Sequence, residues 1–167
     1  LAQEILEDGA PECALLLDTA ENNSAVSQRL EAVKATLHQQ GVKTARMRIA
    51  AQELTSQSFL WAQPSYDVVI VAEPAAAEAL VKKKTELQLS QRLYGVGISD
   101  AIALALEEES LSACAVIGEY ASGYLAVQQA LRAAQGQTVS SQTMPFVIVR
   151  GEDFDALDIQ KLLFAVD

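Results

Sequence analysis

Short apolar runs of strand length alternate with helical segments along most of this 167-residue chain. The clearest stretch is 93–134, where strand, polar turn and helix follow one another twice. Further apolar runs lie at 13–17, 67–72 and 145–149. Such runs are typical of parallel strands buried on both faces, with helices as the crossovers between them. The pattern predicts an α/β fold with a doubly wound, mainly parallel sheet of about five to six strands flanked by helices.

Residues typical of helix ends mark the crossover segments. Ser24 is a candidate N-cap, Gly41 is a candidate stop, and Pro74 fits the first turn of a helix. The run 43–49 alternates weakly, which predicts an edge strand with its charges facing water. Residues 118–122 are expected to form a turn. The expected helices cover 1–9, 25–40, a short stretch within 50–63, 74–87, a segment that ends near 109, and 123–134.

Composition agrees with one packed α/β domain. Half of the residues are hydrophobic, mostly Ala, Leu and Val, whereas aromatic residues make up 5%. This mixture suits helices that pack against β-branched strands. A chain of 167 residues is long enough for one well-buried core and short for two. We therefore expect residues 1–167 to form a single domain.

The charge balance weighs against direct contact with nucleic acid. The formal net charge is −10, and a polyanion gains affinity from clustered Lys and Arg. The one basic run, at 82–84, lies in a helical segment, where a solvated face is expected. No apolar stretch reaches the roughly 20 residues that span a membrane. The first residues show no signal peptide and no initial methionine, so they do not reveal the location of the protein.

The chain lacks the common motifs for catalysis, cofactors and metals. It has no P-loop, no G-x-G-x-x-G and no G-x-S-x-G pattern. Cys13 and Cys114 lie in apolar runs without other Cys or His nearby, which predicts small buried residues rather than a metal site or a disulfide. The single histidine, His38, is expected on the surface of a helix. We expect a protein without enzyme activity, cofactor or metal.

Polar side chains gather where the predicted strands end. In a parallel α/β sheet, ligands lie outside these carboxyl ends and beside helix N-termini. Hydroxyl, amide and carboxylate groups can hydrogen-bond a polar solute, and a tyrosine ring can stack on it. The candidate ligand-binding residues are Thr19, Asn22, Asn23, Glu73, Ser99, Asp100, Glu119 and Tyr120.

Each candidate also has a structural alternative. The Thr and Asn residues after the first strand favour turns and caps. Glu73 can accept hydrogen bonds from hydroxyls or interact with the dipole of the next helix. Ser99 and Asp100 are equal candidates for the N-cap of the helix that follows them. Tyr120 and Tyr124 lie four residues apart and can pack together along a helix.

Five segments carry a resemblance to a known family through their order and spacing. They are CALLLDT followed by SAVSQRLEAVKATLHQQG, then DVVIVAEP, LYGVGISD, CAVIGEYASGYLAVQQAL and the ending MPFVIVRGEDFDALDIQKLLF. They resemble the C-terminal lobe of the type 1 periplasmic-binding-protein fold, shared by sugar-binding proteins and the effector domains of lactose-repressor-like regulators. GYLAV after an acidic–aromatic pair is most similar to the lipoprotein-anchored solute-binding proteins of Gram-positive bacteria.

The resemblance implies a two-lobe protein whose closure around hinge strands traps a ligand. This chain would be the C-terminal lobe, and the N-terminal lobe of the same protein would be its partner. The implied function is non-enzymatic binding of a sugar-like solute for ABC-type uptake or sensing, with a membrane permease as a further partner. The implied location is extracellular, membrane-anchored or periplasmic.

Two other functions stay open at this point. The chain could be the effector-binding and dimerising domain of a lactose-repressor-like regulator in the cytoplasm, which an upstream helix-turn-helix would indicate. An upstream lipobox or signal peptide would instead indicate an exported binder. A flavodoxin-like or receiver domain is the third class. Phosphorylation is not expected, because Glu73 stands where a receiver would end its third strand with Asp.

The sequence departs from the family pattern at two places. Family members often carry Asp in the turn after the fourth strand, where Ile98 or Ser99 stands, and Gln at the end of the fifth, where Ile117 and Gly118 stand. Because planar polar groups hold sugar hydroxyls, these changes put a hexose or pentose ligand in doubt. Arg29 matches the family's arginine near the first loop, and alternatively covers the sheet edge or pairs with a carboxylate.

Overall fold

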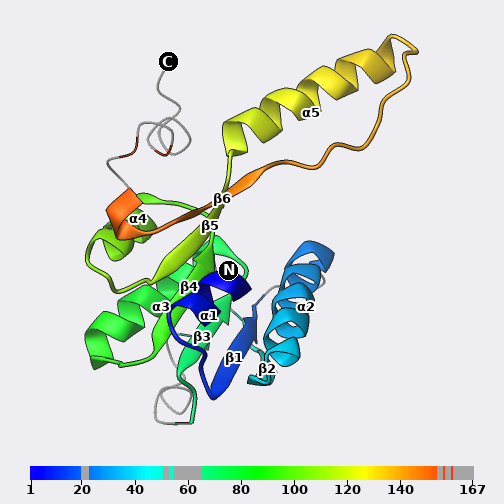
Figure 1. The fold of residues 1–167 in the computed structure, drawn as a ribbon. Coiled ribbons are helices and arrows are strands. Elements are labelled where there is room, and N and C mark those ends of the chain that lie inside the picture. The colour runs from blue at the N-terminus through cyan, green and yellow to red at the C-terminus, as the bar shows by residue number, and fades with distance from the viewer. Residues whose placement is uncertain (20–22, 51–52, 55–64, 154–155, 157–158, 160–167) are drawn as a thin grey trace.

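A central six-stranded sheet with helices on both faces organises the chain (Figure 1). This computed structural model describes residues 1–19, 23–50, 53–54, 65–153, 156 and 159. The strands are β1 (Cys13–Asp18), β2 (Lys43–Arg48), β3 (Val68–Val71), β4 (Arg92–Val96), β5 (Ala113–Ile117) and β6 (Phe146–Val149).

The strands lie in the order β2-β1-β3-β4-β5-β6. The first five are parallel, whereas β6 pairs antiparallel with β5. The predicted α/β fold with a mainly parallel sheet is thereby confirmed. The helices are α1 (Ala2–Glu7), α2 (Ser24–Gln39), α3 (Pro74–Leu87), α4 (Asp100–Glu107), α5 (Glu119–Ala134) and the short 3-10 turn η3 (Gly151–Asp153).

Two hydrophobic layers enclose the sheet. Helices α1 and α2 contribute Ile5 and Leu30 to the layer on one face, and α3 and α4 contribute Leu80 and Ile102 to the layer on the other. Alternate residues of β1 point into the two layers, because successive side chains of a strand face opposite sides. A strand covered on both faces needs apolar residues at consecutive positions, which explains the run that predicted it.

The position of β2 at the sheet edge is confirmed, and its charged residues Lys43, Arg46 and Arg48 are exposed, as expected. The Arg46 guanidinium also lies against Asp18 of β1, a contact that the sequence did not predict. The Asp18 side chain is 2% exposed, and the Arg46 side chain is 28% exposed. A buried carboxylate requires a partner, and the neighbouring strand supplies it.

Two helices begin at residues other than those predicted. Asn23 rather than Ser24 caps α2, because its Oδ1 accepts hydrogen bonds from two backbone N–H groups of the first turn, at 3.0 and 3.3 Å. Helix α5 begins at Glu119, so 119–122 form its first turn instead of a separate turn. That stretch carries no helix-breaking residue. The helix expected within 50–63 falls almost wholly outside the described residues.

The expected burial is confirmed for Cys114, whereas Cys13 at the start of β1 is only half-buried. Both are free thiols on strands that are not neighbours. Burial raises the pKa of the Cys114 thiol to about 12. His38 is exposed in the last turn of α2.

Helix α5 projects away from the sheet instead of packing on it, and residues 137–145 run back from its far end to β6 (Figure 1). Among the helices that the structure describes, none combines the length and apolar character needed to cross a membrane.

Candidate functional site

The carboxyl ends of the five parallel strands share one edge of the sheet. From β1 the chain crosses through α2 to β2, and from β3 it crosses through α3 to β4 in the opposite direction along the sheet. The two crossover helices lie on opposite faces, so they diverge between β1 and β3. Open α/β sheets bind ligands in the crevice outside such a switch point.

Thr19 and Glu73 meet at this switch point. Thr19 follows β1, and its Oγ1 donates a hydrogen bond to Glu73 Oε2 at 2.7 Å. Thr19 is 7% exposed, whereas Glu73 is half-buried at the entry to α3. The other carboxylate oxygen, Oε1, accepts no hydrogen bond within the described chain. Two predicted site residues, 54 positions apart in sequence, are therefore in direct contact.

The backbone around Glu73 keeps its side chain available. Glu73 is the N-cap residue of α3 but makes no side-chain cap, and Pro74 follows as the first helical residue. Gly97 in the turn after β4 lies directly against Pro74, because a Cβ added there would overlap the proline ring. The turn after β4 is thus held next to the carboxyl end of β3.

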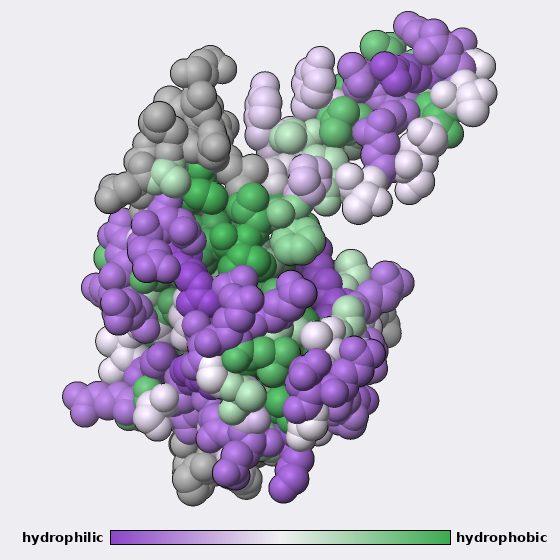
Figure 2. Space-filling model, in the orientation of Figure 1, coloured by the Kyte–Doolittle hydropathy of each residue, from purple (hydrophilic) through white to green (hydrophobic). Residues whose placement is uncertain are grey.

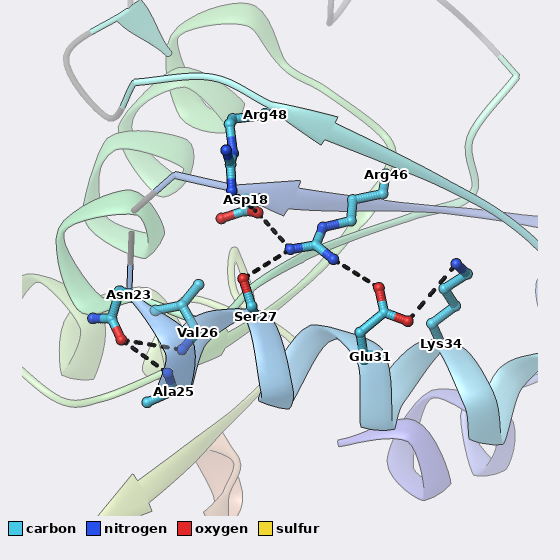
Figure 3. Close-up of polar contacts among 9 residues, drawn as sticks. All are labelled: Asp18, Asn23, Ala25, Val26, Ser27, Glu31, Lys34, Arg46 and Arg48. Carbon is cyan, nitrogen blue, oxygen red and sulfur yellow. Dashed lines mark hydrogen bonds and ion pairs between the residues drawn. The ribbon is translucent and has the colours of Figure 1, made fainter. Parts of the chain in front are cut away.

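Asp18 lies beside Thr19 as the last residue of β1 (Figure 3). Its Oδ2 accepts hydrogen bonds from Nη2 of Arg46 at 2.5 Å and of Arg48 at 3.4 Å. Its Oδ1 is buried and has no partner among the residues described. The hydrogen bond to Asp18 is the main cause that raises the pKa of Arg46.

Arg46 also ties the edge strand to helix α2. It donates to Glu31 Oε1 at 2.7 Å and to Ser27 Oγ at 3.0 Å, both on α2 (Figure 3). Glu31 in turn lies 3.8 Å from Lys34 Nζ. These charged side chains connect the sheet to the helix, so their first role is to hold α2 in place against β2.

Arg29 covers the end of β3. Its Nη1 donates to the carbonyl oxygen of Ala72 at 3.2 Å. This contact fits the alternative that Arg29 covers the sheet edge, and it also brings a guanidinium to the strand ends that flank Thr19 and Glu73.

Ser99 and Asp100 differ in their local roles. Ser99 is the N-cap of α4, since its Oγ accepts a hydrogen bond from the Ile102 N–H at 3.3 Å. Asp100 is exposed in the first turn of the same helix, where a carboxylate interacts favourably with the helix dipole. Both lie at the carboxyl end of β4.

The remaining described candidates lie at the start of α2 and in the first turn of α5. Asn23 is exposed and caps α2, whereas Asn22 lies outside the described residues. Tyr120 is 77% exposed in the first turn of α5, and the structure does not describe the side chain of Glu119. Tyr124 is 60% exposed.

Sequence reasoning missed the charged group formed by Asp18, Arg46 and Arg48. A weak signal was present, because an acidic residue directly ends an apolar run and two arginines alternate in the edge strand. Their pairing depends on the register of β1 with β2, in which Asp18 lies opposite Arg48. The register follows from tertiary packing and not from either segment by itself.

Comparison with known proteins identifies the fold. No family model and no curated protein sequence matches this chain. Solved structures do match. An ABC transporter solute-binding protein from Agrobacterium vitis, bound with alpha-D-tagatopyranose, has a TM-score of 0.88 at 14% identity, with 99% of this chain and 59% of that chain covered.

Two further structures show the range of proteins with this fold. A carbohydrate transporter solute-binding protein from Agrobacterium radiobacter, in complex with D-arabinose, has a TM-score of 0.84 at 15% identity, covering 97% of this chain and 62% of that one. A LacI family transcriptional regulator from Brachyspira murdochii, also described as an ABC transporter, has a TM-score of 0.77 at 14% identity, covering 92% and 56%.

These likenesses confirm the predicted fold, that of type 1 periplasmic binding proteins. At 14 to 16% identity they show the fold alone. The chain spans less than two thirds of the length of each of these proteins.

Proposed function

We propose that this chain is one lobe of a two-lobe protein that binds a small sugar-like solute for ABC-type uptake or for sensing, without catalysing a reaction. The observation that carries the proposal is the contact between Thr19 and Glu73 across the β1/β3 switch point. Solved proteins with the same fold include several with bound monosaccharides, which supports the solute class.

The chemistry at this point suits a solute rich in hydroxyl groups. Glu73 Oε1 can accept a hydrogen bond from a hydroxyl, because Thr19 occupies the other oxygen of the same carboxylate. The Thr19 hydroxyl oxygen retains lone pairs that can accept a further hydrogen bond. Ser99 and Asp100 follow β4, the neighbour of β3, at the same edge of the sheet, within the reach expected of a small-molecule pocket.

The two departures from the family pattern restrict which chemical groups of a solute this site can bind. Ile98 packs, partly buried, against the hydrophobic layer of α3 and α4, and Ile117 ends β5. Apolar side chains at these places cannot hydrogen-bond a hydroxyl, so we expect the solute to present an apolar or deoxygenated edge there.

The partner lobe and the transport context are parts of the same proposal. The chain corresponds to roughly three fifths of the proteins that share its fold, and the missing share would be the N-terminal lobe. An isolated lobe provides half of a ligand's burial, so tight binding requires both lobes. The assembled protein would act outside the cytoplasmic membrane, in the periplasm or anchored to the cell surface, and pass its solute to a membrane permease.

A regulator is the second candidate, favoured by the likeness to the Brachyspira murdochii protein. In that case the same edge of the sheet would bind an effector in the cytoplasm. The first 60 or so codons of the gene distinguish the two, through a helix-turn-helix or an export signal.

Calorimetry on a chain that includes the preceding lobe tests the proposal against a panel of sugars and nucleosides. We expect one class of sugar to bind, and Thr19→Val and Glu73→Gln each to weaken its binding at least tenfold. Thr19→Val removes a hydroxyl, and Glu73→Gln removes the charge and exchanges one acceptor oxygen for an NH2 donor. Thr85→Val and Glu78→Gln make the same chemical changes on exposed positions of α3 and should leave binding unchanged. Absence of binding by every sugar would refute the solute class.

A further inference from the structure

Three of the six arginines of this chain gather where β1, β2 and β3 end. Arg46 and Arg48 lie on β2, and Arg29 reaches from α2 to the carbonyl oxygen of Ala72, the residue after β3. The chain has 22 acidic residues and only 12 Lys and Arg, so its composition by itself does not explain this concentration of positive charge. We call Arg29, Arg46 and Arg48 the arginine group.

The strand register places the arginine group on both sides of Asp18. Asp18 lies opposite Arg48 in the register of β1 with β2, and the register of β1 with β3 brings Ala72 next to Asp18 on its other side. Neighbouring strands lie about 5 Å apart, so β2 and β3, which flank β1, are about 10 Å apart. Since Arg29 is hydrogen-bonded to Ala72, guanidinium groups lie on either side of the Asp18 carboxylate.

The Asp18 carboxylate does not balance the charge of the whole group. Its Oδ2 lies 2.5 Å from Arg46 Nη2 but 3.4 Å from Arg48 Nη2. Arg46 has a second carboxylate partner in Glu31, at 2.7 Å (Figure 3). Arg48 shares Asp18 at the longer distance, and Arg29 hydrogen-bonds only a carbonyl oxygen among the residues described. Arg29 and Arg48 therefore carry an excess of positive charge.

These two arginines are open to solvent, whereas Asp18 is not. The Arg48 side chain is 66% exposed, and Arg29 is also exposed. The Asp18 side chain is 2% exposed, so a solute at the strand ends cannot contact it directly. Figure 3 shows Arg46 and Arg48 approaching its carboxylate from different sides. Asp18 therefore holds Arg46 in place, and Arg48 remains available at the edge of the sheet.

We propose that the solute carries a negative charge, and that Arg48 and Arg29 bind its carboxylate or phosphate group. This inference rests on the proposed function, to which it adds the charge class of the sugar. Guanidinium groups donate paired hydrogen bonds to either anion. Arg48 uses only Nη2 and Arg29 only Nη1 in the contacts described above, so each retains two further nitrogens as donors.

The hydroxyl-binding residues lie on the other face of the same edge. Leu16 packs in the layer of α1 and α2 and Leu17 in the layer of α3 and α4, and Asp18 and Thr19 continue this alternation. Glu73 contacts Thr19 and so belongs to the second face. The anionic group and the hydroxyl groups of a solute would thus meet separate halves of the site. A neutral sugar would leave the excess charge of the arginine group without an anion.

Calorimetry on a longer chain that includes the preceding lobe tests the charge of the solute. Glucose, galactose and mannose are each compared with the corresponding uronate and 6-phosphate. We expect a uronate or a 6-phosphate to bind at least tenfold more tightly than its neutral parent, and which of the two binds distinguishes a carboxylate from a phosphate. The difference should shrink between about 0.02 M and about 0.5 M NaCl, because salt screens the attraction between exposed charges.

Variants of β2 assign the effect to the arginine group. Arg48→Gln should weaken binding of the anionic sugar at least tenfold and change the affinity for its neutral parent less than about twofold. Lys43→Gln is the matched control, because it removes one positive charge from an exposed position at the opposite end of the same strand. This control should leave both affinities unchanged.

Two results would overturn the charge inference and leave the proposed function intact. One is a neutral sugar that binds at least as tightly as its uronate and its 6-phosphate. The other is binding of an anionic sugar that neither Arg48→Gln nor Arg29→Gln weakens. Failure of every neutral and anionic sugar to bind would instead refute the solute class, and this inference with it.

Discussion

Arg150, the residue after the last strand, holds Glu4 of the first helix through hydrogen bonds to one carboxylate oxygen, from Nη2 at 2.6 Å and from Nε at 3.1 Å. Its Nη1 lies 3.0 Å from Asp8 Oδ1 at the end of the same helix. These contacts join the two ends of the described chain, 146 residues apart. Both carboxylates raise the pKa of Arg150, which stays charged under all ordinary conditions.

Replacing this arginine should loosen α1 from the domain. We expect Arg150→Gln to lower the free energy of unfolding by about 1–2 kcal/mol, because the three side chains are mostly covered and the contacts form a network. Chemical denaturation measures the difference. Arg132→Gln makes the same change at an exposed position of α5 and should cost less than about 0.5 kcal/mol. Equal stability of the two variants would contradict the prediction.

Tyr94 should make stability depend on pH through Asp8. The fully buried Tyr94 hydroxyl donates to Asp8 Oδ2 at 2.6 Å, and burial together with Asp8 raises the pKa of Tyr94, so it remains a donor. Burial by itself would raise the pKa of Asp8, but the hydrogen bonds from Tyr94 and Arg150 outweigh it and lower this pKa. The lowered pKa means that the contact stabilises the fold above about pH 4 and loses its contribution as the pH falls further.

The variant Tyr94→Phe should therefore cost about 1–2 kcal/mol at pH 7. The difference from the parent protein should narrow as the pH is lowered from 5 towards 3, measured as free energies of unfolding. Tyr124→Phe changes an exposed tyrosine and should have little effect at any of these pH values. A constant cost for Tyr94→Phe across this range would show that Asp8 is not the group involved.

Gly97 should not tolerate a side chain. Its φ of +102° is strained for other residues, and an added Cβ would overlap Pro74. We expect Gly97→Ala to lower the free energy of unfolding by about 2–4 kcal/mol. Gly123→Ala is the matched control, because a Cβ there meets nothing within 4 Å inside a helix. That control should be neutral or stabilising by up to about 1 kcal/mol.

The buried carboxylate of Asp18 should contribute more to the stability of the fold than the exposed carboxylate of Glu31, although both pair with Arg46. Asp18→Asn removes the charge that faces Arg46, so we expect a loss of about 1–3 kcal/mol in the free energy of unfolding. Glu31→Gln breaks the other ion pair of Arg46, but the Glu31 side chain is 54% exposed and the cost should stay below about 0.5 kcal/mol. Thermal or chemical unfolding measures the stability of the two variants. A larger loss for Glu31→Gln than for Asp18→Asn would contradict the prediction.

Local patterns were sufficient to predict the elements of the fold. The continuous apolar runs of β1 and β3 indicated buried parallel strands, and Pro74 marked the first residue of α3. The start of α5 was predicted four residues too late, at Gly123, because residues 118–122 were expected to form a separate turn. Such boundaries depend on small differences in propensity and are the least certain part of a sequence pattern.

The location of the candidate site at the strand ends could be predicted from the sequence, but the contacts between its residues could not. The sequence indicated that Thr19, Glu73 and Ser99 follow strands, and the structure places them at one edge. It did not indicate that Thr19 and Glu73 touch, or that Asp18 pairs with Arg46. Those contacts require that β3 and β2 flank β1, which no local pattern encodes.

The sequence by itself determined the alternation of strands and helices and the polar character of the strand ends, because both follow from the periodicity of side chains along the backbone. The tertiary structure alone decided which strand ends meet and which apolar residues remain uncovered. Helix α5 shows the difference, since the spacing of its exposed apolar residues is that of any amphipathic helix. These residues are Tyr120, Tyr124, Val127 and Leu131. Only the path of the chain away from the sheet reveals that this face has no partner within the described part of the domain, because burial depends on what lies opposite in space.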